Sequence, residues 1–537
     1  MRAIKAFSAL LLIAVLLIGM TSCSSRKAAN DSASSTVAES QRGDTRGLHS
    51  FAQSQGDFNT EEYGRFTENE FLATGNHPLS TFSIDVDTAS YSNVRRFINE
   101  GQLPPADAVR IEELINYFKY DYPEPEGDQP FSISTELAAC PWQPAHKLVH
   151  VGLQGKRMAT ANAPANNLVF LIDSSGSMNS PDKLPLLKSA FKLLIDQLRE
   201  QDRVAIVAYA GSAGLVLPST SGSNKETILS AIDKLEAGGS TAGGQGIQLA
   251  YQIAKRNFLA AANNRVILAT DGDFNVGVSS DGELLRLIES ERESGVFLTV
   301  LGFGTGNIKD SKMELLADKG NGNYAYIDTI HEARKALVTG LGGTLTAIAK
   351  DVKIQVEFNP AKVQAYRLLG YENRLMRAEE FNDDKKDAGE LGSGHSVTAL
   401  YEVIPVGVGT KLAHVDPLRY QSRKPSAEAF AGNELMTVKF RYKTPQGTES
   451  AMLARSLMDD DTRGVSASEN TRFAAAVAEF GMLLRDSKLK GRSTFENCLA
   501  LARESTGNDS DGYRAEFISL VERAAALNRD QRQARRE

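Results

Sequence analysis

Four continuous apolar runs between residues 167 and 348 constrain the fold of this chain more strongly than any other feature. They read "NLVFLI", "RVAIVAYA", "RVILAT" and "VFLTVLGFG" and occupy residues 167–172, 203–210, 265–270 and 296–304. Strands without polar alternation are typical of a parallel sheet that is covered on both faces. Amphipathic stretches separate them, for example residues 224–235, where Ile228, Ile232 and Leu235 share a helical face. This alternation predicts an α/β domain with a doubly wound, mostly parallel sheet.

Segments with a different pattern flank this region on both sides. Five of them alternate polar and apolar residues, as half-buried strands do: residues 131–139, 147–156, 350–360, 395–407 and 434–445. The economical arrangement is one antiparallel β-sandwich into which the α/β domain is inserted. The end of the chain is expected to be helical, with Ser468 or Asn470 as the first cap and a second helix near residues 513–527.

A chain of 537 residues exceeds what one hydrophobic core organises, so several domains are expected. The expected parts are a signal peptide at 1–22, a disordered tether at 23–66, an N-terminal segment at 67–128, sandwich strands at 129–165, the α/β domain at 166–348, further sandwich strands at 349–465 and a helical C-terminal domain at 466–537. The tether is predicted because its residues are small, polar or charged and offer little apolar surface to bury.

The beginning of the chain favours export. Two basic residues precede an apolar run at residues 10–18, which is shorter than the roughly 20 residues needed to span a bilayer. An uncleaved membrane anchor is the alternative. The ending "MTSC" resembles a bacterial lipobox, with Met20 where leucine is usual, and this resemblance implies acylation of Cys23. We therefore expect a lipoprotein of the cell envelope held at a membrane by acyl chains such as palmitate, on the periplasmic side of the outer membrane if the source has two membranes.

Charge and motifs exclude several functions. The formal net charge is -7, and the 60 basic and 67 acidic residues are spread along the chain without the basic stripe that a phosphate backbone requires, so nucleic acid is not an expected partner. The chain has no GxxxxGK[ST] loop, so nucleotide binding is not expected either. It also has no HExxH or GxSxG motif, and no catalytic residue is predicted.

Oxygen-bearing side chains follow the predicted parallel strands. Asp173, Ser175 and Ser177 come directly after the first strand, Thr241 lies in the loop "GGSTAGG", and Asp271 follows the strand that ends in "ILAT". Parallel sheets bind ligands beyond the carboxyl ends of their strands. Two carboxylates and three hydroxyls, without thiolate or imidazole, suit a hard cation such as Mg²⁺, with Ca²⁺ or Mn²⁺ as alternatives. For any one of these residues alone a turn or a helix cap is the favoured explanation, whereas for the set of five we expect metal binding.

These residues resemble the metal-ion-dependent adhesion site of the von Willebrand factor type A domain. "DSSGS" matches its Asp-x-Ser-x-Ser motif, and Thr241 and Asp271 follow in the required order. The resemblance implies that Ser175, Ser177 and Thr241 contact the metal directly, whereas Asp173 and Asp271 often act through water. The stretch "SIDVDTASYS" at residues 83–92 resembles the N-terminal segment of the YfbK-like family of bacterial lipoproteins, which also have a C-terminal domain of unknown function.

The expected function is therefore that of a membrane-anchored binding protein and not of an enzyme. A metal bound through five side chains, some of them through water, keeps a position that an acidic side chain of a protein partner can occupy. Two alternatives remain open. In the first alternative the chain is a metal-dependent hydrolase, for which Asp273 is the only obvious spare carboxylate to act as general base. In the second the ion only stabilises the fold.

Other candidate sites are weaker. Asp85 and Asp87 imitate the metal motif, but no second loop with matching groups is evident, so a turn or helix cap is favoured. His146 and His150 are expected to be partly exposed residues of a strand. Cys140 and Cys498 are read as small buried apolar residues, with a disulfide as the alternative.

Overall fold

The computed structural model describes residues 60–159, 163–240, 243–260, 262–272, 281–340, 346–409, 425–445, 447–459 and 467–535. All of them belong to one unit that spans residues 57–537. The expected signal peptide, Cys23 and most of the expected tether lie outside the described residues, as do Thr241 and Asp273. Among the helices that the structure describes, none combines the length and the apolar composition needed to cross a membrane.

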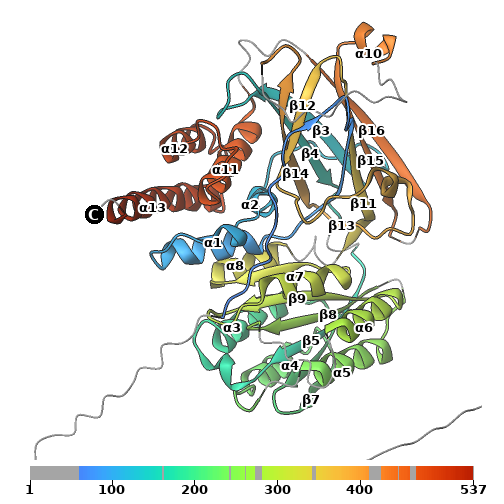
Figure 1. Cartoon of the computed structure of the whole chain (residues 1–537). Coiled ribbons are helices and arrows are strands. Elements are labelled where there is room, and N and C mark those ends of the chain that lie inside the picture. Colours follow the sequence, from blue (N-terminus) through green and yellow to red (C-terminus); the bar gives the residue numbers. More distant parts are fainter. Residues whose placement is uncertain are drawn as a thin grey trace, which may run out of the picture. The chain divides into compact units, whose positions relative to one another are not determined.

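A six-stranded sheet forms the centre of the α/β domain (Figure 1). Its strands are β5 (Asn166–Asp173), β6 (Arg203–Tyr209), β7 (Ala213–Ser221), β8 (Asn263–Thr270), β9 (Val296–Phe303) and β10 (Tyr324–Ile327). The strand order is β10-β9-β8-β5-β6-β7, and every pair is parallel except β6 with the edge strand β7. The prediction of a doubly wound, mostly parallel sheet is confirmed.

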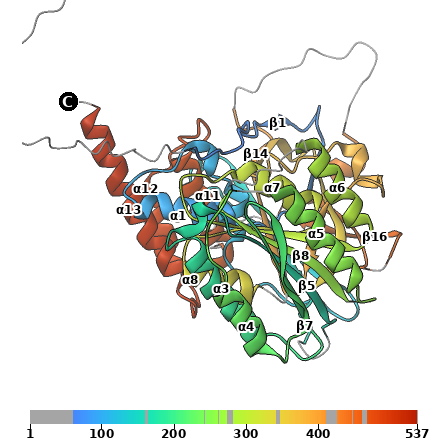
Figure 2. The same ribbon diagram turned by 90° about the horizontal axis from the view of Figure 1, so that it is seen from below.

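Helices cover both faces of this sheet (Figure 2). One face carries α3 (Leu184–Asp196), α4 (Lys225–Asp233) and α8 (Ile330–Arg334), and the other carries α5 (Gly243–Arg256), α6 (Asp281–Glu293) and α7 (Asp310–Lys319). Successive residues of β5 enter opposite cores: Phe170 packs with Phe191 of α3, whereas Leu171 packs with Ile247 of α5. Burial on both faces is why the strand has no polar alternation.

Two antiparallel sheets form the predicted sandwich. The first consists of β1 (Leu72–Ala73), β12 (Val363–Leu369), β14 (Ser396–Pro405), β4 (Lys147–Gly155) and β3 (Phe131–Ala139), in that order. The second consists of β13 (Gly389–Gly392), β11 (Ala347–Phe358), β15 (Glu434–Lys443) and β16 (Ser450–Met458), with β2 (Leu79–Ser83) also paired to β11. The strands come from both sides of the α/β domain, so the inserted arrangement is confirmed.

A third layer is helical and combines helices that precede the α/β domain in sequence with helices that follow it. It consists of α1 (Ala89–Asn99), α2 (Ile111–Asn116), α11 (Glu469–Leu484), α12 (Phe495–Glu504) and α13 (Tyr513–Ala534). Phe118, just after α2, packs on Phe473 of α11 with ring centroids 5.0 Å apart. The Ser468 hydroxyl accepts a hydrogen bond from the N–H of Thr471, so this candidate cap is confirmed. The shorter helical elements of the described residues are α10 (Ala427–Ala431), the 3-10 turns Ala106–Ala108, Gly176–Asn179 and Ala378–Asn382, and the π-helical turn Lys335–Thr339.

The last residues of the expected tether are bound to the fold. The N–H of Thr60 donates to Gly306 O over 2.8 Å, and Glu62 pairs with Lys309 as an isolated parallel bridge. Arg96 of α1 forms an ion pair with Glu61 over 2.8 Å. A disordered tether that continues to residue 66 is therefore wrong for its last residues, because residues 60–62 have backbone and side-chain partners in the α/β domain and in α1.

His150 of β4 and His146, which immediately precedes β4, are both buried, so the prediction of partial exposure is wrong. His150 is 2% exposed, and its ring contacts the hydroxyls of Tyr122 and Thr471. His146 is 8% exposed and contacts Glu402. The helical layer covers this face of the sheet, which the alternation within one strand could not reveal. Cys140 and Cys498 are both buried and unpaired, and both belong to the core of the helical layer.

The burial of His150 predicts a pH dependence of stability. Burial lowers its pKa from 6.5 to about 4, so between these pH values the unfolded chain binds a proton that the folded chain does not. Stability is lost as pH falls through this window, by up to about 1.4 kcal/mol per pH unit. We expect His150→Gln to flatten the plot of unfolding free energy against pH by that amount, measured by urea denaturation between pH 7 and 4. The exposed His77→Gln is the control, and an unchanged slope in the His150 variant contradicts the assignment.

Candidate metal centre

The predicted ligands of the first loop form one oxygen-lined turn. Asp173 is the last residue of β5, and its Oδ1 accepts the N–H of Ser175 over 2.9 Å. The hydroxyl oxygens of Ser175 and Ser177 lie 3.0 Å apart. Asp173 and Ser175 are buried, whereas Ser177 is exposed. The turn therefore begins inside the domain and ends at its surface.

The loop that leads to Thr241 lies against this turn. The N–H of Gly238 donates to Ser174 O over 2.8 Å, and the N–H of Gly176 donates to Gly239 O over 3.0 Å. Thr241 follows two residues later but lies outside the described residues, so its role as a ligand stays a prediction. The structure does place the described part of its loop beside the serines, as the order of the motif predicts.

Asp271 reaches the same edge from β8. The preceding residue, Thr270, donates through its hydroxyl to Asp173 Oδ2 over 3.3 Å, and the Tyr209 hydroxyl at the end of β6 donates to the same oxygen over 3.2 Å. Asp173 and Asp271 are 0% and 1% exposed. The pKa of Asp173 is raised to about 6 by burial, with the charge of Asp271 adding to the effect and the hydrogen bonds from Ser175 and Tyr209 opposing it. Two buried carboxylates thus repel one another at this edge.

Lys183 is the site residue that the sequence analysis missed. It immediately precedes α3, and its Nζ lies 2.9 Å from Asp271 Oδ2, with only 8% of the side chain exposed. The signal in the sequence was its position, because Lys183 is the first basic residue after the "DSSGS" motif. Basic residues are common at surfaces, so position alone does not separate a buried partner from a solvated one.

The described residues fit a hard divalent cation. They supply two carboxylates and two hydroxyls, which are the oxygen ligands that Mg²⁺, Ca²⁺ and Mn²⁺ accept. The repulsion between the buried acids is the electrostatic condition that such an ion relieves. The exposed Ser177 lies on the solvent side of the group, where a ligand of the ion would approach. Asp273, the general base of the hydrolase alternative, lies outside the described residues.

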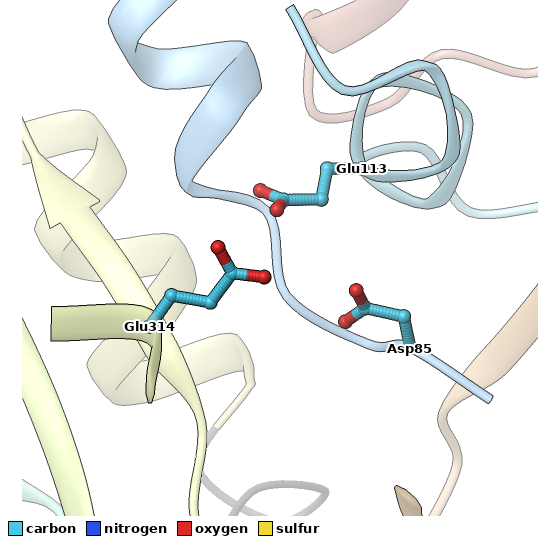
Figure 3. Close-up of side chains that lie close together, drawn as sticks. All are labelled: Asp85, Glu113 and Glu314. Atoms are coloured by element: carbon cyan, nitrogen blue, oxygen red, sulfur yellow. The ribbon is translucent and has the colours of Figure 1, made fainter. Parts of the chain in front are cut away.

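A second group of acids lies elsewhere in the unit. Figure 3 shows Asp85, Glu113 of α2 and Glu314 of α7 with their carboxylates directed toward one another. One oxygen from each lies within 4.8 Å of the others, and all three residues are buried. The expectation that Asp85 has no matching groups on other segments is therefore wrong, because acids about 30 and 230 residues away converge on it.

Two arginines pair with this acid cluster: Arg110 is buried, and the side chain of Arg374 is 12% exposed. Arg374 lies 2.9 Å from Asp85 and 3.4 Å from Glu314, and it also pairs with Asp87 and Asp318. Arg110 pairs with Glu113 and with Asp310 at the start of α7. Burial raises the pKa of Glu113 to about 8 and of Glu314 to about 7, although Arg110 opposes both shifts. We interpret the cluster as an ion-pair network that joins the N-terminal segment, the α/β domain and the loop after β12.

This interpretation predicts a large loss of stability in Arg374→Met. The substitution leaves Asp85, Asp87, Glu314 and Asp318 without their shared cation, and removing one partner of a buried ion pair costs about 3–5 kcal/mol. Urea denaturation at pH 7 measures the change. Arg377→Met is the matched control, because its side chain is 74% exposed and its ion pair with Glu380 is screened by water. Equal effects of the two substitutions contradict the network.

Comparison with known proteins agrees with this architecture. Three family models match: von Willebrand factor type A domain at residues 167–338, a von Willebrand factor model at residues 57–150 and the YfbK C-terminal model at residues 343–527. The last model spans the later sandwich strands together with most of the terminal helices.

Individual relatives cover different shares of the chain. The uncharacterized protein YfbK of Escherichia coli strain K12 is 45% identical over 472 residues, which is 87% of this chain and 81% of that protein. The uncharacterized protein sll0103 of a Synechocystis strain is 32% identical over 167 residues, 31% of this chain and 39% of that protein. A solved von Willebrand factor type A structure from Catenulispora acidiphila has 16% identity and a TM-score of 0.39, and covers 74% of this chain and 91% of that one. The chain belongs to the YfbK family of proteins with a von Willebrand factor type A domain.

Proposed function

We propose that this protein is a lipid-anchored binding protein of the cell envelope that engages an acidic side chain of a protein partner through a divalent metal ion. A von Willebrand factor type A domain implies a function in protein interaction or adhesion. The finer proposal is carried by one observation: the buried Asp173 and Asp271 meet the Ser175–Ser177 turn at the solvent-facing end of the sheet. No catalytic residue is part of the proposal.

Each residue of the site has a separate task. Ser175, Ser177 and Thr241 would hold the ion directly, and Asp173 and Asp271 would balance its charge. Tyr209 and Thr270 position Asp173, because both donate to its Oδ2 and leave Oδ1 to the turn. When bound, a divalent ion supplies an electrophilic centre that a carboxylate of a partner can coordinate. Mg²⁺ is the proposed ion, with Ca²⁺ or Mn²⁺ as alternatives.

The proposed location rests on the start of the chain. The apolar run at residues 10–18 and the lipobox-like "MTSC" support export and acylation at Cys23.

Metabolic labelling with a palmitate analogue tests this proposal. Cys23→Ala is expected to lose the label and to disappear from the membrane fraction.

Metal binding is tested first by thermal unfolding. At a free Mg²⁺ concentration of about 100 times its Kd, we expect the free energy of unfolding to rise by about 2.7 kcal/mol, since the ion binds only the folded state. Asp173→Asn is expected to remove this metal-dependent rise in Tm while the protein stays folded, because asparagine keeps the shape without the charge. Asp233→Asn on α4 is the control, since its side chain is 55% exposed and pairs with Lys192. A metal response retained in Asp173→Asn rejects the site.

Partner binding is tested separately by crosslinking in cells. Proteins captured by wild type but lost in Ser175→Ala, and also lost when wild type is treated with EDTA, are the expected partners, because the hydroxyl and the ion act at the same place. Ser189→Ala on α3 is the control, since its hydroxyl donates only to Pro185 O within its own helix. The adhesion proposal fails if wild type and Ser175→Ala capture the same proteins. In that case a purely stabilising ion remains as the explanation of any metal response.

A further inference from the structure

Lys183 places a fixed positive charge inside the candidate metal centre. Its Nζ lies 2.9 Å from Asp271 Oδ2, and the side chains of Lys183 and Asp271 are 8% and 0% exposed. Most lysines reach into water with a long flexible side chain. This one is directed inward, onto one of the two carboxylates that would balance the ion.

The fold provides a slot for this lysine at Gly304. Gly304 has a φ of +73°, and a Cβ added there would lie 2.3 Å from both Cγ and Cε of Lys183. The alkyl part of Lys183 therefore packs directly on the backbone after β9, where only glycine leaves room for it. The Tyr326 hydroxyl donates to Gly304 O over 2.8 Å and fixes the slot from the neighbouring strand.

The segment at residues 60–62 holds the same loop from outside. Thr60 donates to Gly306 O over 2.8 Å, and Glu61 Oε1 accepts the N–H of Gly306 over 2.9 Å. The loop after β9, on which Lys183 packs, is thus bound on both sides. A held ammonium group retains its effect on Asp271, because little of it is screened by water.

We infer that Lys183 is a built-in competitor of the metal, which shares Asp271 with the ion and weakens divalent binding. This inference rests on the proposed function, since it concerns the same site. A cation that approaches Asp271 is repelled by the ammonium group, as any like charge in a site of low dielectric constant is. Two carboxylates balance a divalent ion, so Lys183 leaves the occupied site with one net positive charge. That charge favours an anionic group on the partner.

Calorimetric titration of the full-length protein in detergent with Mg²⁺ alone, and with Mn²⁺ alone, tests the inference. Lys183→Met keeps the length and packing of the alkyl chain but removes its charge, and we expect at least roughly tenfold tighter binding of both ions. Lys192→Met removes a lysine charge from the same helix at a side chain that is 47% exposed, and it is expected to stay within about twofold of wild type. An equal or lower affinity in Lys183→Met overturns the inference.

A second variant addresses the position of the lysine without changing its charge. Gly304→Ala fills the slot and displaces the Lys183 side chain from it. We therefore expect Gly304→Ala to bind the metal more tightly than wild type, as Lys183→Met does. Circular dichroism checks that the variant is folded. Asp173→Asn separates this inference from the proposed function. One outcome overturns only the role of Lys183: wild type binds the metal, Asp173→Asn does not, and Lys183→Met binds it with the affinity of wild type. No binding in wild type, Lys183→Met and Gly304→Ala overturns both.

Discussion

The parallel pairing of β5 with β6 and β8 is the interaction on which the candidate site depends. Asp173 lies directly opposite Tyr209, and Ile172 lies opposite Ala269, one residue before Thr270. This register brings the ends of three strands to one edge, so that two hydroxyls from neighbouring strands reach the same carboxylate. A shift of one residue in β5 would turn Asp173 to the other face of the sheet and separate it from both.

The acid cluster and the metal centre bury their charges in different ways. The acid cluster around Asp85 and Glu314 contains its own cations, Arg110 and Arg374, and joins segments that are far apart in sequence. The metal centre contains one cation, Lys183, for two acids, and it opens to solvent at Ser177. Ion pairs between segments that are far apart in sequence are suited to holding those segments together. A group of oxygen ligands that reaches the surface is suited to taking a further ion.

Much of the fold could be predicted from periodicity. Strand β3 was predicted at residues 131–139 and begins and ends there, and β15 begins at the predicted residue 434. Strands β12 and β16 were among those missed. β16 is mostly exposed, and its weak pattern does not separate a strand from a loop. The predicted partial exposure of His150 was also wrong, because the segments that cover its side chain come from other parts of the chain. For the site, the motif predicted that Asp173, Ser175, Ser177 and Asp271 share one edge, but it gave no sign that Lys183 turns inward.

The sequence by itself determined the α/β domain, its insertion into a sandwich and the oxygen chemistry of the loops, because hydrophobic period and residue type are local properties of the chain. The tertiary structure decided which charges meet. Lys183 packs on Gly304 and forms an ion pair with Asp271. Asp85, Glu113 and Glu314 converge beside two arginines. Pairing and burial of charge depend on distances between segments far apart in sequence, and only the packed fold sets those distances.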